Sequence, residues 1–442
     1  MAIHPKIIKG KLYQYRTLLS YFFLGLLFAA PFIKFNGEQL VLLDVLQRKF
    51  VFFGIIFWPQ DFYLFVLALL TFIVFVVLFT VVFGRVFCGW ICPQTIFLEM
   101  VFRKIEYWIE GEPVKQKKLN ERPMDMDKFW RKTAKHGLFF MISFLIANVF
   151  LGYIIGSEAL IEIITQPIAS HLSGFIAIWI FTFVFYMVFS RAREIVCTVI
   201  CPYGRLQGVL LDSQSIIVAY DYNRGEPRGK VQKGFENLKG DCIDCKLCVQ
   251  VCPTGIDIRN GTQMECTNCT ACIDACDMVM EKTNRPLRLI GFKSEEEITS
   301  KKPFKLSRRV YGYAAVLLVL MSLLSFLMID RSDVKTTILR ASGTLYQMRD
   351  DKMVSNLYNA ELVNKTSKAL EFQIVPEDKS IKLQYIQKEH KLAYGGSVKL
   401  TFFVLMPQTE VKQFKSEIKF KLVSAGKVID EFQTTFIAPP NN

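Results

Sequence analysis

Histidine is scarce in this sequence, with four residues in 442, and no Cys-x2-Cys-His motif for haem attachment occurs. His136 and His171 lie near the ends of hydrophobic segments that we expect on opposite faces of a membrane, so a haem ligated by both is not expected. There is also no phosphate-binding glycine loop, no dinucleotide-binding fingerprint and no nucleophile elbow. These absences argue against a haem protein, a nucleotide-dependent enzyme and an α/β-hydrolase.

The composition places much of the chain in lipid. Apolar residues make up 52% of the sequence, with 39 phenylalanines, and the mean hydropathy is +0.28. The formal net charge is +14, but lysines and arginines cluster beside apolar runs, where membrane proteins carry them to fix their orientation. Glu99 and Glu106, on one basic segment, are expected on a solvated or salt-bridged face. We therefore expect a membrane protein that contacts lipid and does not bind nucleic acid.

Five apolar segments are long enough to be membrane helices. They lie at about 17–33, 61–87, 137–156, 174–190 and 310–330. The first has no small-residue cleavage site after a short core, so we interpret it as a membrane helix rather than a removed signal peptide. Two further apolar stretches, 40–46 and 50–58, are too short to span, and we expect them at the outer interface or packed on the helix bundle.

The basic residues predict an orientation. Segment 101–136 is rich in Lys and Arg, whereas segment 157–173 contains neither. Because these residues accumulate on the cytoplasmic side, we expect the amino terminus and residues 206–309 in the cytoplasm. Residues 331–442 would then lie in the periplasm, beyond a bacterial inner membrane that the chain crosses several times.

All twelve cysteines belong to motifs, and eight form two runs with the spacing Cys-x2-Cys-x2-Cys-x3-Cys. This spacing is typical of two-cluster bacterial ferredoxins, in which three thiolates of each run bind one [4Fe-4S] cluster and the fourth crosses to the other. The rule predicts Cys242, Cys245, Cys248 and Cys276 at the first cluster, and Cys252, Cys266, Cys269 and Cys272 at the second. Such thiolates need a reducing compartment. We expect an α+β ferredoxin domain over residues 206–309.

The other four cysteines form two Cys-x3-Cys-Pro motifs, at Cys88 and Cys92 and at Cys197 and Cys201. Each motif follows an expected span and an arginine, so residues 1–205 resemble a duplicated helix pair. Cysteines four apart share one helix face and a following proline tends to end the helix, so four thiols would converge at the inner membrane surface if the halves meet. Such a site would suit Cu(I), a third iron–sulfur cluster or an exchangeable dithiol, while the alternative is four buried structural cysteines.

After the fifth apolar segment the pattern changes to short alternating runs, with turn residues between them. We expect strands at 356–363, 369–375, 382–386, 397–405, 417–423 and 427–435. A domain of this size with such strands is typically an immunoglobulin-like sandwich, here over residues 331–442 and without a disulfide. The predicted fold class is a multi-domain membrane protein: a five-span α-helical domain, an inserted two-cluster ferredoxin domain and an all-β sandwich.

The order of these features resembles the CcoG family of cytochrome c oxidase accessory proteins, also called FixG or RdxA. The likeness rests on Phe-Cys-Gly-Trp-Ile-Cys-Pro-Gln-Thr at 87–95, on Cys-Thr-Val-Ile-Cys-Pro-Tyr-Gly-Arg at 197–205, on the ferredoxin runs and on the exported sandwich. It implies a membrane-bound iron–sulfur oxidoreductase that acts in assembly of cbb-type cytochrome oxidase and reduces Cu(II) to Cu(I) for delivery. From this resemblance, the eight ferredoxin cysteines are expected to be cluster ligands. Cys88, Cys92, Cys197 and Cys201 are the candidates for contact with copper or for passing electrons.

Two other functions compete with this interpretation. One is a quinol dehydrogenase subunit of a respiratory reductase pathway, because membrane proteins of the nitrate and nitrous oxide reductase pathways share both kinds of cysteine motif. The other is a non-enzymatic, redox-sensing scaffold whose sandwich binds an oxidase subunit or assembly factor. The sandwich and the missing haem motif favour the copper reductase, and the electron donor is left open.

Overall fold

The computed structural model describes most of the chain. The described residues are 3–35, 37–45, 49–229, 240–301, 303–341, 343, 345–349, 352–366, 369–386, 391–411 and 413–439. Leu46, the last residue of the apolar stretch expected at 40–46, lies outside them. The structure divides into two compact units: Met1–Ile33 with Leu67–Ser322 form the first unit, and Lys34–Val66 with Leu323–Asn442 form the second.

Four helices in the described part of the chain are long and apolar enough to cross a membrane. They are α2 (Phe62–Phe83), α7 (Met126–Ile155), α9 (Leu172–Met187) with its π-helical extension η4 (Val188–Ala192), and α15 (Arg308–Ile329). The 22 residues of α2 carry no charge and rise about 33 Å, roughly the thickness of the hydrocarbon core. The expected span at 17–33 corresponds to α1 (Lys11–Ala29), which buries Arg16 and is not one of the four. The predicted count of five spans is therefore approximate.

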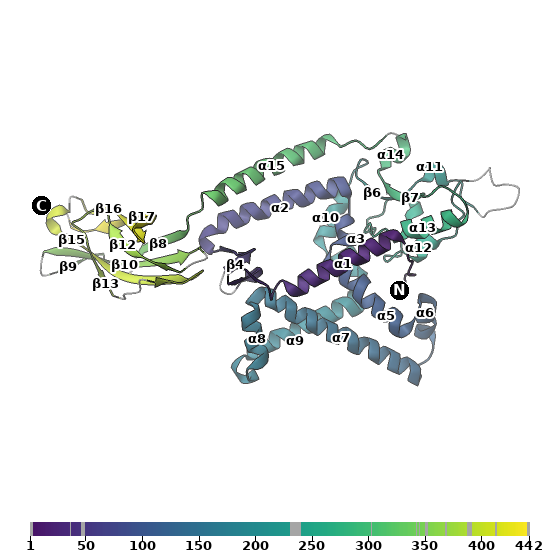
Figure 1. The fold of residues 1–442 in the computed structure, drawn as a ribbon, viewed down its shortest axis with the longest axis horizontal. Coiled ribbons are helices and arrows are strands. Elements are labelled where there is room, and N and C mark those ends of the chain that lie inside the picture. The colour runs from purple at the N-terminus through teal and green to yellow at the C-terminus, as the bar shows by residue number, and fades with distance from the viewer. Residues whose placement is uncertain are drawn as a thin grey trace. The chain divides into compact units, whose positions relative to one another are not determined.

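Aromatic packing holds the helical part of the first unit together. Helices α7 and α9 lie side by side, and α8 (Ser157–Thr165) connects them at one end (Figure 1). The buried ring of Phe102 stacks on Phe189 with centroids 4.4 Å apart and meets Phe139 edge-on at 4.8 Å. Because Phe102 ends the π-helical segment η2 (Phe97–Phe102), this cluster fixes the chain after the first thiol motif against α7 and α9.

Each Cys-x3-Cys-Pro motif ends one helical segment and starts another. The segments are α3 (Val86–Trp90) and α4 (Pro93–Ile96) at the first motif, and η5 (Val196–Ile200) and α10 (Pro202–Leu210) at the second. Proline suits the first helical position, where its missing N–H is not needed. The chain therefore turns at the second cysteine of each motif. After the first motif it continues through α5 (Arg103–Glu110) and α6 (Pro113–Glu121).

The ferredoxin part of the first unit has the α+β composition expected from the cysteine runs. Strands β6 (Ile217–Tyr220) and β7 (Ile290–Lys293) pair antiparallel. Helix α12 (Leu247–Gln250) contains Cys248 of the first run, and helix α13 (Ala271–Lys282) contains Cys272 and Cys276 of the second. The remaining elements are α11 (Tyr222–Gly225), η6 (Ile258–Asn260) and α14 (Glu295–Ser300). Ile273, Leu289 and Ile290 form the centre of the core beside the cysteines.

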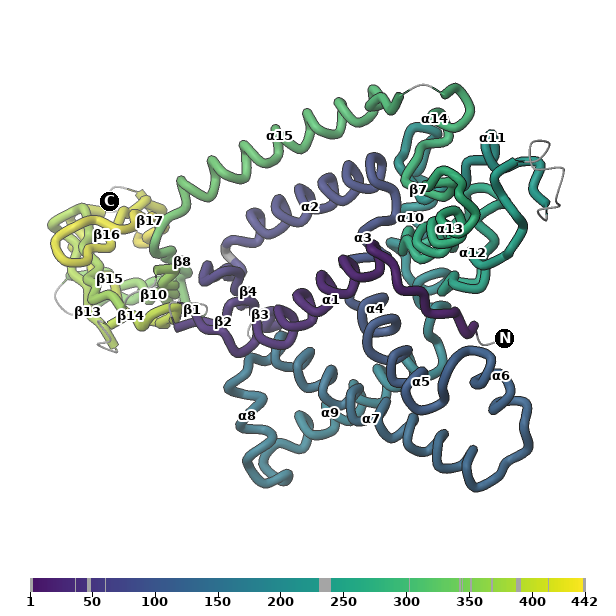
Figure 2. Tube along the Cα trace, turned by 45° about the vertical axis from the view of Figure 1, so that its right-hand side comes forward, coloured from purple at the N-terminus to yellow at the C-terminus, as the bar shows by residue number. Residues whose placement is uncertain are grey.

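The N-terminal end of α1 meets α13 of the ferredoxin part (Figure 2). The Asp274 carboxylate accepts hydrogen bonds from the backbone N–H groups of Leu12, at 3.3 Å, and Tyr13, at 2.7 Å. Free N–H groups in a first helical turn need such an acceptor, and the cap residue Gly10 has no side chain to supply one. A Cβ atom at Gly10 would lie 2.2 Å from Cγ of Asp274. Glycine therefore makes room for a cap that comes from α13.

The second unit contains the expected all-β sandwich. One sheet has the order β13-β15-β10-β8, with β9 also paired to β10, the other has the order β12-β16-β17, and β11 pairs with β14. Tyr358 lies opposite Phe402 in the sheet, and both are fully buried in the core between the sheets. The strands are β8 (Val334–Arg340), β9 (Gln347–Arg349), β10 (Met353–Asn364), β11 (Leu370–Glu371), β12 (Gln373–Pro376), β13 (Lys382–Tyr385), β14 (Lys391–Leu392), β15 (Ser397–Pro407), β16 (Lys415–Ser424) and β17 (Lys427–Ile437).

Residues 34–66 belong to this second unit, although the sequence placed them in a membrane domain over 1–205. They form the pair β1 (Lys34–Phe35) and β2 (Glu38–Gln39), the small sheet β3 (Val41–Asp44), β4 (Lys49–Phe52) and β5 (Ile55–Phe57), and the turn η1 (Pro59–Asp61). The core of the small sheet packs against Tyr394 of the sandwich. Asp61, 2% exposed, pairs with Lys365 at 2.5 Å and Arg331 at 2.6 Å. Apolar packing and a buried ion cluster thus attach this loop to the sandwich rather than to the helix bundle, one of the two positions predicted for it.

Candidate electron-transfer site

The eight ferredoxin cysteines surround two separate cavities in the first unit. One cavity is lined by Cys242, Cys245, Cys248 and Cys276. The other is lined by Cys252, Cys266, Cys269 and Cys272, and it also touches Cys248. Each cavity thus combines cysteines from both runs, in the grouping that the crossed-ligand rule predicts.

The two cysteine runs share one backbone geometry. Asp244 and Lys246 flank Cys245 with φ of 54° and 56°, and Asn268 and Thr270 flank Cys269 with φ of 52° and 67°. Left-handed residues are uncommon outside glycine, so their recurrence at equivalent positions shows that each run wraps its cavity in the same way. Alternation of left-handed residues with ordinary ones is the geometry of backbone nests at iron–sulfur sites.

The chemistry of the cavities fits an iron–sulfur cluster. Four thiols are spread around each cavity, and four cysteine thiolates are the usual ligands of a [4Fe-4S] cluster. Burial raises the pKa of Cys266 and of Cys276 to about 12. Thiolates form at such positions when metal binding stabilises their charge.

The two thiol motifs meet each other in the first unit. The buried Cys88 thiol donates to Oε1 of Gln207 at 3.0 Å, and Gln207 belongs to α10 after the second motif. Arg85 donates to the same oxygen at 3.2 Å and also to the carbonyl of Met264. The four thiols are close enough to interact electrostatically: Cys88 with Cys92 and Cys197, and Cys92 and Cys197 with Cys201. The duplicated halves therefore bring all four thiols to one region.

The first motif also touches the loop of the second cysteine run. Trp90 donates from its indole nitrogen to the carbonyl of Asn268 at 3.2 Å, between the cluster cysteines 266 and 269. A Cβ atom at Gly89 would lie 2.4 Å from the carbonyl oxygen of Thr267, so only glycine allows this approach. Arg16 of α1 donates to the carbonyl of Gly89 at 2.7 Å and holds the turn in place. The first motif thus lies beside the second cavity.

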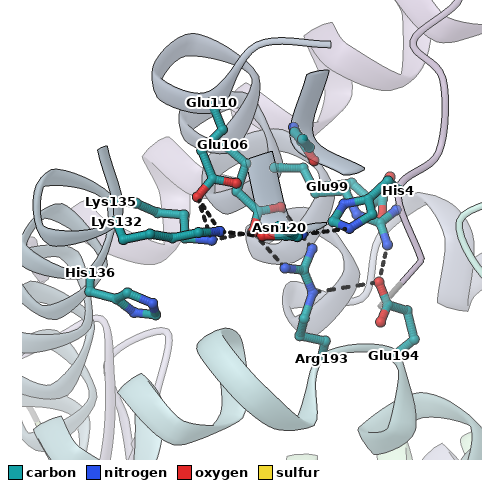
Figure 3. A network of polar contacts seen from close by, with 12 residues as sticks. His4, Glu99, Glu106, Glu110, Asn120, Lys132, Lys135, His136, Arg193 and Glu194 are labelled. Atoms are coloured by element: carbon teal, nitrogen blue, oxygen red, sulfur yellow. Dashed lines mark hydrogen bonds and ion pairs between the residues drawn. The ribbon is translucent and has the colours of Figure 1, made fainter. Parts of the chain in front are cut away.

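A buried ion network joins the two halves of the thiol region (Figure 3). Arg193 donates two hydrogen bonds to the Glu106 carboxylate, at 2.6 and 2.9 Å. Arg103, 1% exposed, pairs with Glu99 and Glu194 and donates to the carbonyl of Pro253 at 3.2 Å, directly after a cluster cysteine. Glu99 and Glu106 are therefore salt-bridged, one of the two alternatives expected for them, and Glu106 is buried rather than solvated.

The network gives the first unit a defined dependence on pH. Burial by itself would raise the pKa of Glu106, but the hydrogen bonds and charge of Arg193 outweigh burial and hold the pKa below its ordinary value of 4.5. Such a carboxylate contributes stability above the pKa of the unfolded chain, and the contribution is lost as the pH falls through the pKa of the folded protein. Acid should therefore weaken this network below about pH 4.5.

We expect Glu106→Gln to destabilise the first unit by about 3 kcal/mol at neutral pH, because it removes the buried negative charge that pairs with Arg193 and Lys135. The variant should also lose part of the acid sensitivity described above. Thermal unfolding of the purified protein in detergent, followed from neutral to acidic pH, measures both effects. Glu121→Gln on exposed α6 is the matched control and should behave as the unmodified protein. An unchanged pH profile in Glu106→Gln would contradict the prediction.

Sequence reasoning missed several residues of this site. Gln207, Arg103 and Asp274 carried no local motif, because their partners are distant in the sequence. Arg85 and Arg193 are the arginines that precede the two motifs at similar distances, but they make different contacts. Arg85 binds Gln207 and the second cysteine run, whereas Arg193 binds Glu106. The glycine at position 89, inside the first motif, is a sequence feature that could have indicated a close backbone contact.

Three family models match the chain. A 4Fe-4S dicluster domain matches residues 192–295, a 4Fe-4S binding domain matches residues 65–111, and the IG-like fold at the C-terminal of FixG matches residues 324–439. The match over 65–111 contains Cys88 and Cys92 and none of the eight ferredoxin cysteines.

Three curated relatives match at length. Nitrogen fixation protein FixG of Rhizobium meliloti is 36% identical over 299 residues, which are 66% of this chain and 56% of that protein. Protein RdxA of Cereibacter sphaeroides is 33% identical over 390 residues, which are 84% of this chain and 81% of that protein. Protein RdxB of the same organism is 34% identical over 396 residues, with the same two shares. The match thus spans little more than half of FixG but four-fifths of RdxA and RdxB.

The apolar helices, the cysteine-lined cavities and these matches define a membrane protein that transfers electrons through iron–sulfur clusters. More particularly, the chain belongs to the FixG/RdxA family, as the order of its motifs predicted.

Proposed function

We propose that this protein reduces Cu(II) to Cu(I) at the thiols of Cys88, Cys92, Cys197 and Cys201, and that it does so in the assembly of cbb-type cytochrome oxidase. The observation that carries the proposal is the contact of the first thiol motif with the loop between Cys266 and Cys269. A group that receives single electrons from a neighbouring cluster suits the one-electron reduction of copper. Soft thiolate ligands favour Cu(I) over other first-row ions, so the product would be stabilised where it forms.

The residues proposed to hold the two [4Fe-4S] clusters are those that line the two cavities. Cys242, Cys245, Cys248 and Cys276 would bind the first cluster, and Cys252, Cys266, Cys269 and Cys272 the second. When bound, such clusters accept and release single electrons. The chain's own residues hold the second cavity and the motif together: Trp90 and Arg103 bind backbone carbonyls of the cysteine loops, and Arg85 binds the segment before them.

In the proposed topology, the amino terminus and residues 206–309 face the cytoplasm of a bacterial cell, and residues 331–442 face the periplasm. The thiol motifs would then lie at the inner surface of the membrane, beside the ferredoxin part. The exported sandwich, which contains no cysteine, would serve to bind a partner such as an oxidase subunit or assembly factor rather than to transfer electrons.

The test is a reduction assay with the full chain. Purified protein is reduced chemically under anaerobic conditions, freed of reductant and mixed with Cu(II) and a chelator specific for Cu(I). We expect the clusters to be reoxidised and the Cu(I) chelate to form. About one copper ion should be reduced per electron stored. If reduced protein transfers its electrons to a quinone analogue but not to copper, the quinol dehydrogenase function replaces the proposed one. Failure to react with either acceptor would favour the redox-sensing scaffold.

A further inference from the structure

An apolar cavity lies in the helical part of the first unit, next to the first thiol motif. Its volume is about 290 Å³, close to the lower limit for pockets that bind small molecules. Helix α1, the chain from Pro93 to Phe97, helix α7, and the end of α9 with η4 form its walls, which are mostly aromatic and aliphatic. No Asp, Glu, Lys or Arg is among the described residues that line it.

Two polar groups stand out in these walls. The side-chain nitrogen of Gln94 is buried and has no hydrogen-bond partner among the described residues. A buried N–H without an acceptor costs free energy, so it needs an explanation. Tyr153 donates its hydroxyl hydrogen to the carbonyl of Leu27 at 2.7 Å, and its oxygen can still accept a hydrogen bond. The wall of the cavity therefore contains one unused donor and one acceptor, and the Gln94 donor reaches an occupant through rotation of its side chain.

These features select the chemistry of the occupant. A nucleotide or another charged cofactor would find no counter-charge in the cavity, and a lipid chain alone would leave the Gln94 donor unpaired. A quinone ring is flat and apolar, carries carbonyl acceptors and brings an isoprenoid tail that is soluble in the membrane. Phe150 lines the cavity from α7, a helix able to cross the membrane, and is 41% exposed, so a molecule dissolved in lipid could approach there.

The cavity also adjoins the candidate electron path. Gln94 follows Cys92 by two residues, and the Cys92 thiol lies within hydrogen-bonding reach of the Gln94 backbone N–H. We propose that the cavity binds the ring of an isoprenoid quinone, that Gln94 donates to one of its oxygens, and that the hydroquinone form is the electron donor for the proposed copper reduction. This inference rests on the proposed function for the fate of the electrons, but not for the binding itself.

The reaction balances without a further reactant. Oxidation of the hydroquinone breaks two O–H bonds, and the two protons pass to water. The two electrons leave one at a time and reduce two Cu(II) ions to Cu(I). Since a hydroquinone delivers two electrons and each copper ion accepts one, a protein between them needs two places to hold an electron. Two cluster cavities provide them.

The test measures binding of decylubiquinone to the full-length, cluster-loaded protein in lipid nanodiscs. Gln94→Leu should weaken binding about tenfold through loss of the hydrogen bond, and Val149→Trp should abolish it by filling the cavity. Gln166→Leu makes the same change as Gln94→Leu on the exposed surface after α8 and should bind as the unmodified protein does. Cluster content and reduction by dithionite verify the folding of each variant, and Val149→Phe replaces Val149→Trp if the larger side chain prevents folding.

Saturable binding that is weakened by both cavity variants supports the inference, as does anaerobic bleaching of the cluster absorbance by decylubiquinol. Equal binding by the unmodified protein and both cavity variants, or no saturable binding, would overturn it. The two proposals fail separately. Protein that reduces copper after chemical reduction but does not bind decylubiquinone refutes only the cavity assignment, and protein that is reduced by decylubiquinol but inert toward copper refutes only the copper reductase.

Discussion

Replacement of all four motif cysteines, Cys88, Cys92, Cys197 and Cys201, by serine abolishes copper reduction while both iron–sulfur clusters remain. This is the largest effect that we expect, because serine keeps the size of the side chain but binds Cu(I) poorly compared with a thiolate. The rate of Cu(I) chelate formation by chemically reduced protein should fall at least about a hundredfold, which corresponds to about 2.7 kcal/mol of lost transition-state stabilisation.

The control for this variant lies within the second motif. Val199 sits between Cys197 and Cys201 and is exposed, so Val199→Ala tests whether any change in the turn disturbs the reaction. It should reduce copper at the normal rate. Iron content and the visible spectrum should be normal in both proteins, because the eight ferredoxin cysteines are intact. Copper reduction at an unchanged rate by the four-serine variant would remove these thiols from the mechanism.

The second expected result is a difference between the two cluster sites. Cys269→Ser should stop copper reduction almost completely, whereas Cys245→Ser should lower it far less when both proteins are reduced chemically. The structural reason is that the loop around Cys269 touches the first thiol motif through Trp90 and Gly89. Cys245 lines the other cavity and is exposed. Chemical reductant can reach either cluster directly, so only the cluster beside the motif is indispensable.

Iron analysis and electron paramagnetic resonance of the reduced proteins are needed alongside the rates. Each variant should retain about half of the iron, with the signal of one cluster lost, since four cysteines line each cavity. If Cys245→Ser stops copper reduction as completely as Cys269→Ser while it retains the second cluster, electrons do not leave from the second cavity, and the contact at Gly89 has no functional meaning.

Local patterns predicted the fold well where short-range sequence determines structure. The cysteine spacing predicted the division of the eight thiols into two groups, and alternation predicted most of the longer strands in the sandwich. Strand β8 was not predicted, because its inward residue Val334 is followed by a polar run with Lys335, Thr336 and Thr337, in which alternation of apolar residues is weak. The length of α2 and its lack of charge made that span evident.

The features that sequence could not predict all depend on contacts between distant segments. Residues 34–66 belong to the sandwich unit, and Asp61 forms ion pairs there with Lys365 and Arg331. No local sequence pattern predicts such a pairing. The contact of Gly89 with the Thr267 carbonyl also could not be predicted from the sequence, since a glycine inside a cysteine motif is compatible with many backbone geometries. The thiol motifs themselves were recognised, but which cavity they approach required the fold.

The cap that Asp274 provides for α1 bears on how the protein matures. Asp274 lies on α13 between Cys272 and Cys276, which line different cavities, so its position depends on the closure of both cysteine runs. We therefore expect the first turn of α1 to lack its acceptor until iron and sulfide are inserted and α13 is fixed in place. Cofactor insertion is then also a step in the biogenesis of the helical region. We expect cells limited for iron to accumulate a form of this protein in which the amino-terminal segment is open to proteolysis.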